Sequence, residues 1–276
     1  MSLELDTKGT NVSIEVMDIE VVTEDVTEDS RGNNDRYLLC IISCEKNRDR
    51  KQILKDSWID DLTEINDKID VLWVYGNPEL EDNYIEAGDE LHAKCDDSYD
   101  RLVDKMDILW DYIHKRKKDY FKIIKCDDDN VIHTTRFTEL LNETHDLPIF
   151  GRSCVDEKFA NNKSAHLDRG AWSGGFKIGW LYIIKMEVVD EFINNKMGLT
   201  HLGSHEDKRF YDMIRHKYQF TENKELEEKF LFFAIPSIKY RGNQKRKYKS
   251  KIDKCIRSST LVSNLNSESL KNIKLD

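Results

Sequence analysis

An apolar segment that ends in three aspartates most restricts how this chain can fold. Residues 120–124 read Tyr-Phe-Lys-Ile-Ile, which is typical of a buried strand, and Asp127, Asp128 and Asp129 follow shortly after. Adjacent carboxylates repel one another and raise one another's pKa, so such a triplet costs stability. A divalent cation relieves the repulsion, and Mg²⁺ and Mn²⁺ favour carboxylate oxygens combined with substrate phosphates. The segment therefore predicts a site that binds a metal ion together with a diphosphate.

Two earlier apolar runs predict that this strand belongs to a parallel sheet. Residues 37–42 and 71–75 are continuously apolar, as expected for strands covered on both faces, and residues 47–58 and 97–118 have a helical pattern. The resulting β-α-β-α-β order implies parallel strands joined by right-handed crossovers. Ligands of such sheets bind at the carboxyl ends of the strands, where the aspartate triplet falls. We therefore expect an α/β fold with a central, mostly parallel sheet and flanking helices.

The helix expected over residues 97–118 has the clearest pattern in the chain. Asp97 is in position to cap its N-terminus, and the cations of residues 114–118 suit its C-terminal end. Its apolar face comprises Tyr99, Leu102, Val103, Met106, Trp110 and Ile113.

The whole chain divides by composition into four regions. Residues 1–35 form an acidic N-terminal segment, and residues 36–130 form a strand–helix half. Residues 131–238 form a second half, and residues 239–276 form a basic, polar C-terminal segment. The second half is expected to hold strands at 148–152 and 230–235 and helices from 187 and over 210–218.

Charge and hydropathy exclude several classes of protein. The net charge of −10 disfavours non-specific binding to nucleic acid, because a polyanion would be repelled. No apolar run is long enough for a transmembrane segment, and the first residues lack the apolar core of a signal peptide. The six cysteines show no C-x-x-C pairing, and Cys40 and Cys126 fall inside strand patterns. We expect a soluble protein of a reducing, cytoplasmic-type compartment.

Two more segments carry chemistry in the second half. Trp172, Ser173, Gly174 and Gly175 form a small-residue turn beside an aromatic ring, which would let the backbone approach a sugar or diphosphate. An ordinary turn would look the same. Glu206 and Asp207 precede the helix expected over 210–218, where carboxylates commonly serve as caps.

Several motifs between residues 37 and 220 occur in the order found in one enzyme family. They are Arg50-Lys51-x-x-Leu54-Lys55-x-Ser57-Trp58, Asp97-x-Tyr99-x-x-Leu102-x-x-Lys105, the strand ending in Asp127-Asp128-Asp129, Phe150-Gly151-Arg152, Ser173-Gly174-Gly175 and Glu206-Asp207. In this order they resemble glycosyltransferase family 31, the β1,3-galactosyltransferase and Fringe group. The chain departs from the family pattern after Gly175, because three larger residues separate it from Gly179.

The resemblance implies a fold and an activity. The fold would be of the GT-A type, with a Rossmann-like nucleotide-sugar half at 36–130 and an acceptor-binding, catalytic half at 131–238. The activity would be inverting transfer of a sugar, galactose or N-acetylglucosamine being favoured, from a UDP-sugar to a hydroxyl of a glycan or glycoprotein. The product would be β-linked, and the cofactor would be Mn²⁺ or Mg²⁺.

The resemblance also implies residue roles. Asp129, with Asp127, would hold the metal ion, and Asp207 would be the catalytic base, with Glu206 as the supporting carboxylate. The residues implied at the donor are Asp128, Arg50, Lys105 and Asp97, and those at the acceptor are Trp172, Ser173, Gly174 and Gly175. For Arg50 and Lys105, a structural ion pair is an equal alternative.

Two other functions are compatible with parts of this pattern. The first is a module that binds sugar nucleotides or glycans without turnover. The second is a different Mg²⁺ enzyme, such as a phosphotransferase with an aspartate nucleophile. Its aspartate would be expected after the first strand, where Ser43, Cys44 and Glu45 stand instead.

Overall fold

The apolar runs of the sequence form the centre of a mixed sheet. In this computed structural model, the described residues are 35–117, 119–154, 176–196, 206–214, 217 and 261–262. Within these ranges the large sheet has seven strands, ordered β3-β4-β2-β1-β5-β8-β7. Its strands are β1 (Tyr37–Ile42), β2 (Ile69–Gly76), β3 (Tyr84–Ala87), β4 (Glu90–Ala93), β5 (Lys122–Asp127), β7 (Ile149–Cys154) and β8 (Phe176–Lys185). A small second sheet pairs β6 (Val131–Ile132) with β9 (Leu261–Val262).

The predicted parallel arrangement is confirmed for the central strands. β1 pairs in parallel with both β2 and β5, and β2 pairs in parallel with β4. The remaining pairs of this sheet, β3 with β4, β5 with β8 and β7 with β8, are antiparallel. The class is therefore α/β, with a parallel centre and antiparallel edges.

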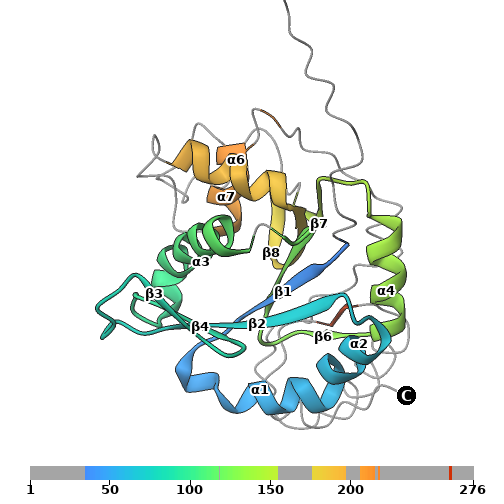
Figure 1. Cartoon of the computed structure of the whole chain (residues 1–276), viewed down its shortest axis with the longest axis horizontal. Helices are drawn as coiled ribbons and strands as arrows, with labels where there is room; N and C mark the ends of the chain where they lie inside the picture. Colours follow the sequence, from blue (N-terminus) through green and yellow to red (C-terminus); the bar gives the residue numbers. More distant parts are fainter. Residues whose placement is uncertain are drawn as a thin grey trace, which may run out of the picture. The chain divides into compact units, whose positions relative to one another are not determined.

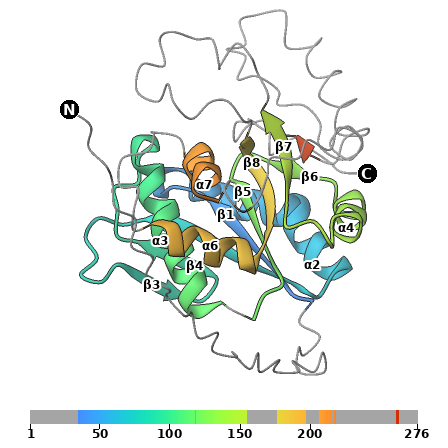
Figure 2. The same cartoon turned by 90° about the horizontal axis from the view of Figure 1, so that it is seen from above.

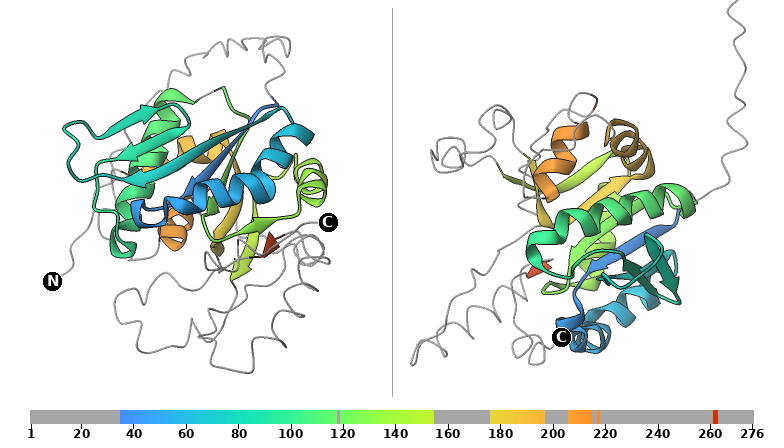
Figure 3. Two further views of the ribbon diagram at one scale, coloured as in Figure 1. Left: turned by 90° about the horizontal axis from the view of Figure 1, so that it is seen from below. Right: turned by 90° about the vertical axis from the view of Figure 1, so that its left-hand side faces the viewer.

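Helices cover both faces of the large sheet (Figures 1 and 2). The α-helices of the described ranges are α1 (Asp49–Leu54), α2 (Asp60–Ile65), α3 (Leu102–Arg116), α4 (Thr134–Glu143), α6 (Met186–Lys196) and α7 (Glu206–Ile214). A π-helical turn, Lys55–Ile59, joins α1 to α2, and 3-10 turns at Glu45–Asn47 and Tyr99–Arg101 precede α1 and α3. Figure 3 shows α1 and α2, in blue, lying across the strands on one face and α3, in green, on the other.

Each face of the sheet buries its own apolar cluster. Leu39 and Ile41 of β1 pack with Trp58 and with side chains of α2 and α4. Leu38 and Cys40, which point to the opposite face, pack with Trp110 of α3 and with side chains of α6 and α7. All six residues of β1 are buried, which explains its continuous apolar sequence.

The pairing of β1 with β5 positions the predicted metal site. Ile42 at the end of β1 lies opposite Asp127 at the end of β5, so the segment after β1 adjoins the aspartate triplet. β2 and β5 lie on opposite sides of β1, which makes this edge a topological switch point. A ligand crevice is expected there.

Two expectations about the helix near residue 100 are wrong. The α-helix begins at Leu102, and Asp97 does not cap it, because its carboxylate accepts hydrogen bonds from other elements. Tyr99 does not join the apolar face that packs on the sheet, because 78% of it is exposed. Both residues precede the α-helix, in a segment that faces the carboxyl ends of the strands.

Several elements were not predicted, and some predictions lie outside the described residues. β8, α4 and the β3–β4 hairpin add to the predicted elements. The strand expected at 230–235 and the acidic and basic segments at 1–35 and 239–276 are almost entirely outside the described ranges. Among the described residues, none of the helices combines the length and apolar character needed to cross a bilayer.

Candidate functional site

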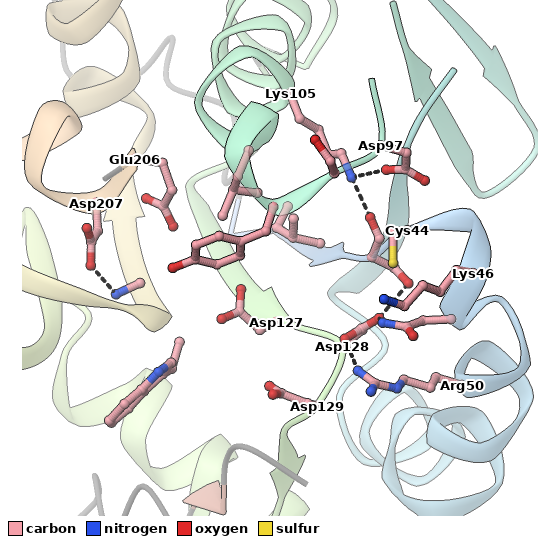
Figure 4. Close-up of a pocket in the computed structure, with 18 residues that line it drawn as sticks. Cys44, Lys46, Arg50, Asp97, Lys105, Asp127, Asp128, Asp129, Glu206 and Asp207 are labelled. Carbon is pink, nitrogen blue, oxygen red and sulfur yellow. Dashed lines mark hydrogen bonds and ion pairs between the residues drawn. The ribbon is translucent and has the colours of Figure 1, made fainter. Parts of the chain in front are cut away.

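A cleft of about 560 Å³ lies at the carboxyl ends of β1 and β5. Eight of the predicted site residues line it: Arg50, Asp97, Lys105, Asp127, Asp128, Asp129, Glu206 and Asp207. Figure 4 shows Asp127 and Asp129 facing the centre of the cleft, between Glu206 and Asp207 on one side and Arg50 on the other. The tertiary structure thus brings the aspartate triplet and the Glu206–Asp207 pair into one site.

Asp128 is held by the segment that follows β1. Its Oδ2 accepts hydrogen bonds from Ser43 Oγ at 2.7 Å and Asn47 Nδ2 at 3.1 Å, and its Oδ1 pairs with Arg50 at 2.5 Å. These contacts occupy both oxygens of a buried carboxylate. Asp128 therefore fixes the wall of the cleft, and Arg50 forms an ion pair with it.

Asp97 and Lys105 form a second anchor of the same wall. Asp97 accepts hydrogen bonds from the backbone N–H of Gly76 at 2.8 Å and of Glu45 at 2.5 Å, and it pairs with Lys105. Lys105 is 3% exposed and also donates to the carbonyl oxygen of Ser43 at 2.6 Å. Gly76 has no room for a side chain, because a Cβ there would lie 2.8 Å from Asp97 Oδ1. These contacts tie the ends of β1 and β2 to α3.

A buried lysine joins the two groups of carboxylates. Lys125 is 1% exposed, and its ammonium lies 2.6 Å from Asp127 Oδ1 and 2.9 Å from Glu206 Oε1. It also donates to the carbonyl oxygen of Gly179 in β8. The second oxygen of Glu206 is buried and has no hydrogen-bond partner among the described residues.

Asp207 lies in the first turn of α7, beside Glu206. Its Oδ2 accepts a hydrogen bond of 2.8 Å from the backbone N–H of Gly179. Its side chain is half-buried and lines the same cleft as Asp129. The carboxylates of Asp207 and Asp129 therefore share one cleft.

Burial and mutual repulsion change the acidity of these carboxylates. Burial, with the charges of Asp127 and Asp128, raises the pKa of Asp129 to about 7. Burial also raises the pKa of Glu206 to about 7, although Lys125 acts in the opposite direction. Burial also raises the pKa of Asp127, although the charge of Lys125 acts to lower it. Strongly shifted carboxylates in a cleft are typical of functional sites.

The carboxylates of β5 and its following turn suit a hard cation that also binds substrate oxygens. Asp129 Oδ1 is buried without a hydrogen-bond partner in the described part of the chain, as expected of an atom that awaits a ligand. Over the same described ranges, no cluster of three or more His, Cys, Asp or Glu side chains forms a complete metal site. Mg²⁺ commonly uses one or two carboxylates and takes its other ligands from water and phosphate. Asp127 and Asp129 fit that donor set.

Several residues in and beneath the cleft were not predicted from the sequence. Lys125 could have been noticed as a cation inside an apolar strand, and Gly179 as a glycine inside another. Trp180 and Tyr99 add aromatic rings to the lining, and Lys46 lines it as well. Lys46 forms no hydrogen bond or ion pair with the residues that the structure describes, so it remains available to an anionic ligand.

The predicted acceptor residues Trp172, Ser173, Gly174 and Gly175 lie outside the described residues. No protein-family model matches this chain, and no curated protein resembles it closely enough to count as a relative.

Proposed function

We propose that this protein is a metal-dependent, inverting glycosyltransferase of the GT-A type that moves a sugar from a UDP-sugar to a hydroxyl of a glycan. The observation that carries the proposal is the meeting of Asp127 and Asp129 with Glu206 and Asp207 in one cleft. The order of the sequence motifs, which is similar to that of glycosyltransferase family 31, supports the choice of donor. Galactose and N-acetylglucosamine are the favoured sugars.

In this proposal one wall of the cleft binds the donor and the other acts on the acceptor. Asp127 and Asp129 would hold Mn²⁺ or Mg²⁺, which when bound neutralises charge on the leaving diphosphate. Lys46 is placed to contact an anionic part of the donor. Asp128, Asp97 and Lys105 position the wall through their contacts with the segment after β1.

Asp207 acts on the acceptor. Its carboxylate takes the proton of the acceptor hydroxyl while that oxygen forms a bond to the anomeric carbon. The bond between that carbon and the diphosphate breaks, and its electron pair leaves with UDP. Attack from the face opposite the leaving group turns an α-linked donor into a β-linked product.

Binding of UDP to an Asp129→Ala variant tests the metal assignment directly. With wild-type protein, UDP and Mn²⁺ together should raise the free energy of unfolding by about 2.7 kcal/mol when UDP is at a hundred times its Kd. The variant should fold and lose this Mn²⁺-dependent stabilisation. Thermal melts with UDP, with and without Mn²⁺, measure both quantities.

Asp61→Ala is the matched control, because Asp61 is exposed on α2, away from the cleft. It should respond to UDP and Mn²⁺ as the wild type does. Equal stabilisation of Asp129→Ala and wild type would refute the metal assignment. Binding without turnover in the wild type would instead favour a sugar-nucleotide-binding module.

A screen of donors tests the proposed substrate. Hydrolysis of sugar nucleotides with Mn²⁺ should be fastest for UDP-galactose or UDP-N-acetylglucosamine. Preference for a guanosine or thymidine diphospho-sugar would overturn the UDP assignment while leaving the metal site intact.

A further inference from the structure

Lys125 is a buried cation whose hydrogen-bonding capacity is fully used. An ammonium has three N–H donors. Those of Lys125 are matched by Asp127 Oδ1, Glu206 Oε1 and the carbonyl oxygen of Gly179. The three acceptors belong to β5, α7 and β8. One side chain therefore connects three elements directly beneath the cleft.

The surroundings of Lys125 leave little freedom for these contacts. A Cβ on Gly179 would lie only 2.6 Å from Glu206 Oε1, so a side chain at this position would displace the glutamate. The backbone N–H of Gly179 also donates to Asp207. Gly179 thus binds Asp207 through its N–H and Lys125 through its carbonyl oxygen.

We propose that Lys125 is a positioning residue that couples the donor wall of the cleft to its acceptor wall, by holding Asp127 and Glu206 at the same ammonium group. This inference rests on the proposed function, because it assigns those walls to donor and acceptor. Lys125 touches neither substrate. It acts through the two carboxylates that it orients.

The geometry of these contacts distinguishes this role from simple charge neutralisation. Lys125 engages one oxygen of Asp127 and one of Glu206. The other oxygen of Glu206 is buried without a partner among the described residues, and both side chains line the cleft. Binding to Lys125 therefore orients each carboxylate through one of its two oxygens. Residues that orient metal ligands in this way commonly affect affinity by about 10–100-fold.

The test compares Lys125→Met with Lys122→Met. Lys122 is also fully buried in β5, but its ammonium donates to the carbonyl oxygen of Thr144, and it does not line the cleft. Lys125→Met should weaken Mn²⁺-dependent UDP binding on the order of 10–100-fold and lower kcat of transfer. Lys122→Met should keep both near the wild-type values. Calorimetry with UDP and Mn²⁺, steady-state kinetics and circular dichroism provide the three readouts.

A second pair of variants decides the matter if Lys125→Met does not fold. In Glu206→Gln, the ammonium of Lys125 faces Asp127 as its only anionic partner among the described contacts. This should weaken binding of UDP with Mn²⁺ by about fivefold or more. Asp207→Asn removes an equal charge from the next residue and should leave that affinity near normal.

The outcomes separate this inference from the proposed function. A folded Lys125→Met with wild-type affinity and kcat would overturn the inference alone. Equal affinities in Glu206→Gln and Asp207→Asn would do the same. Wild-type protein that does not bind UDP in the presence of Mn²⁺ would overturn the proposed function and this inference with it.

Discussion

The two ends of β5 each bury a lysine, and the two lysines behave in opposite ways. Lys122 is 0% exposed, and its ammonium donates to the carbonyl oxygen of Thr144. Burial, followed by repulsion from Lys185, lowers the pKa of Lys122 to about 7. Burial also acts to lower the pKa of Lys125, but the charges of Asp127 and Glu206 outweigh it and raise that pKa.

The partners of a buried lysine, rather than its depth, decide whether it is charged. A neutral carbonyl cannot offset the loss of hydration that an ammonium suffers in the core. Two carboxylates can, provided that the geometry holds all three charges together. One end of β5 thus contains a buried lysine that donates to a neutral carbonyl, and the other contains an ionic network beside a cleft.

The largest expected effect tests whether the cleft beside the ionic network of β5 is catalytic. Asp207→Asn should lower the rate of transfer about 10²–10⁴-fold, because the variant keeps its shape but loses the basic oxygen. Affinity for UDP with Mn²⁺ should stay near normal, since those ligands contact the other wall. Steady-state kinetics and calorimetry measure the two effects, and Glu206→Gln should reduce turnover less. If Asp207 only caps α7, the variant will melt at a lower temperature with turnover unchanged.

The next effect tests Lys122, at the start of β5. The pKa of Lys122 falls from 10.5 to about 7 on folding, so the native state binds fewer protons than the unfolded state between these values. Stability is therefore lost as pH falls from 10.5 to 7. As pH falls through this window, the free energy of unfolding of Lys122→Met should therefore rise relative to that of the wild type, by up to about 5 kcal/mol. Urea denaturation at several pH values measures the difference, and parallel curves for the two proteins would contradict it.

Gly179→Ala should disturb only the network end. Its methyl group would meet Glu206 Oε1 at 2.6 Å, which forces the glutamate away from Lys125. We expect a loss of about 1–3 kcal/mol in the free energy of unfolding, as for other overpacked sites. Glu206→Asp, which shortens that side chain, should recover part of the loss when combined with Gly179→Ala. Equal costs in both backgrounds would show that the contact does not matter.

The smallest effect gives the pH dependence opposite to that of Lys122. The pKa of Asp129 rises from 3.8 to about 7 on folding, so the native state binds more protons than the unfolded state in this range. Stability is lost as pH rises from 4 to 7. Without metal, the free energy of unfolding of Asp129→Asn should rise relative to that of the wild type as pH rises through this window, by on the order of 1 kcal/mol. The value is small because the cleft is open to water. Asp61→Asn serves as the exposed control, and a relative loss at pH 8 would contradict the assignment.

Local sequence patterns predicted the centre of the fold correctly. The apolar runs at 37–42, 71–75 and 120–124 correspond to β1, β2 and the start of β5, because strands buried on both faces need continuous apolar residues. The predicted site at the end of β5 follows from the same topology. β8 was missed, because its antiparallel pairing with β5 joins segments that are distant in sequence.

The roles of individual charges were harder to predict. Sequence patterns allowed Arg50 and Lys105 to bind a donor or to form structural ion pairs, and the structure shows ion pairs with Asp128 and Asp97. Asp97 was expected to be a helix cap, but a carboxylate can satisfy backbone N–H groups of any element within reach. It binds those of Gly76 and Glu45 instead.

The sequence by itself determined that the chain forms an α/β fold with carboxylates at the end of a central strand, because periodicity and strand length are local properties. Only the tertiary structure decided that Glu206 and Asp207 lie across the cleft from Asp129. The same holds for Lys125. Whether a buried lysine meets a carbonyl or two carboxylates depends on strands and helices that pack beside it from elsewhere in the chain.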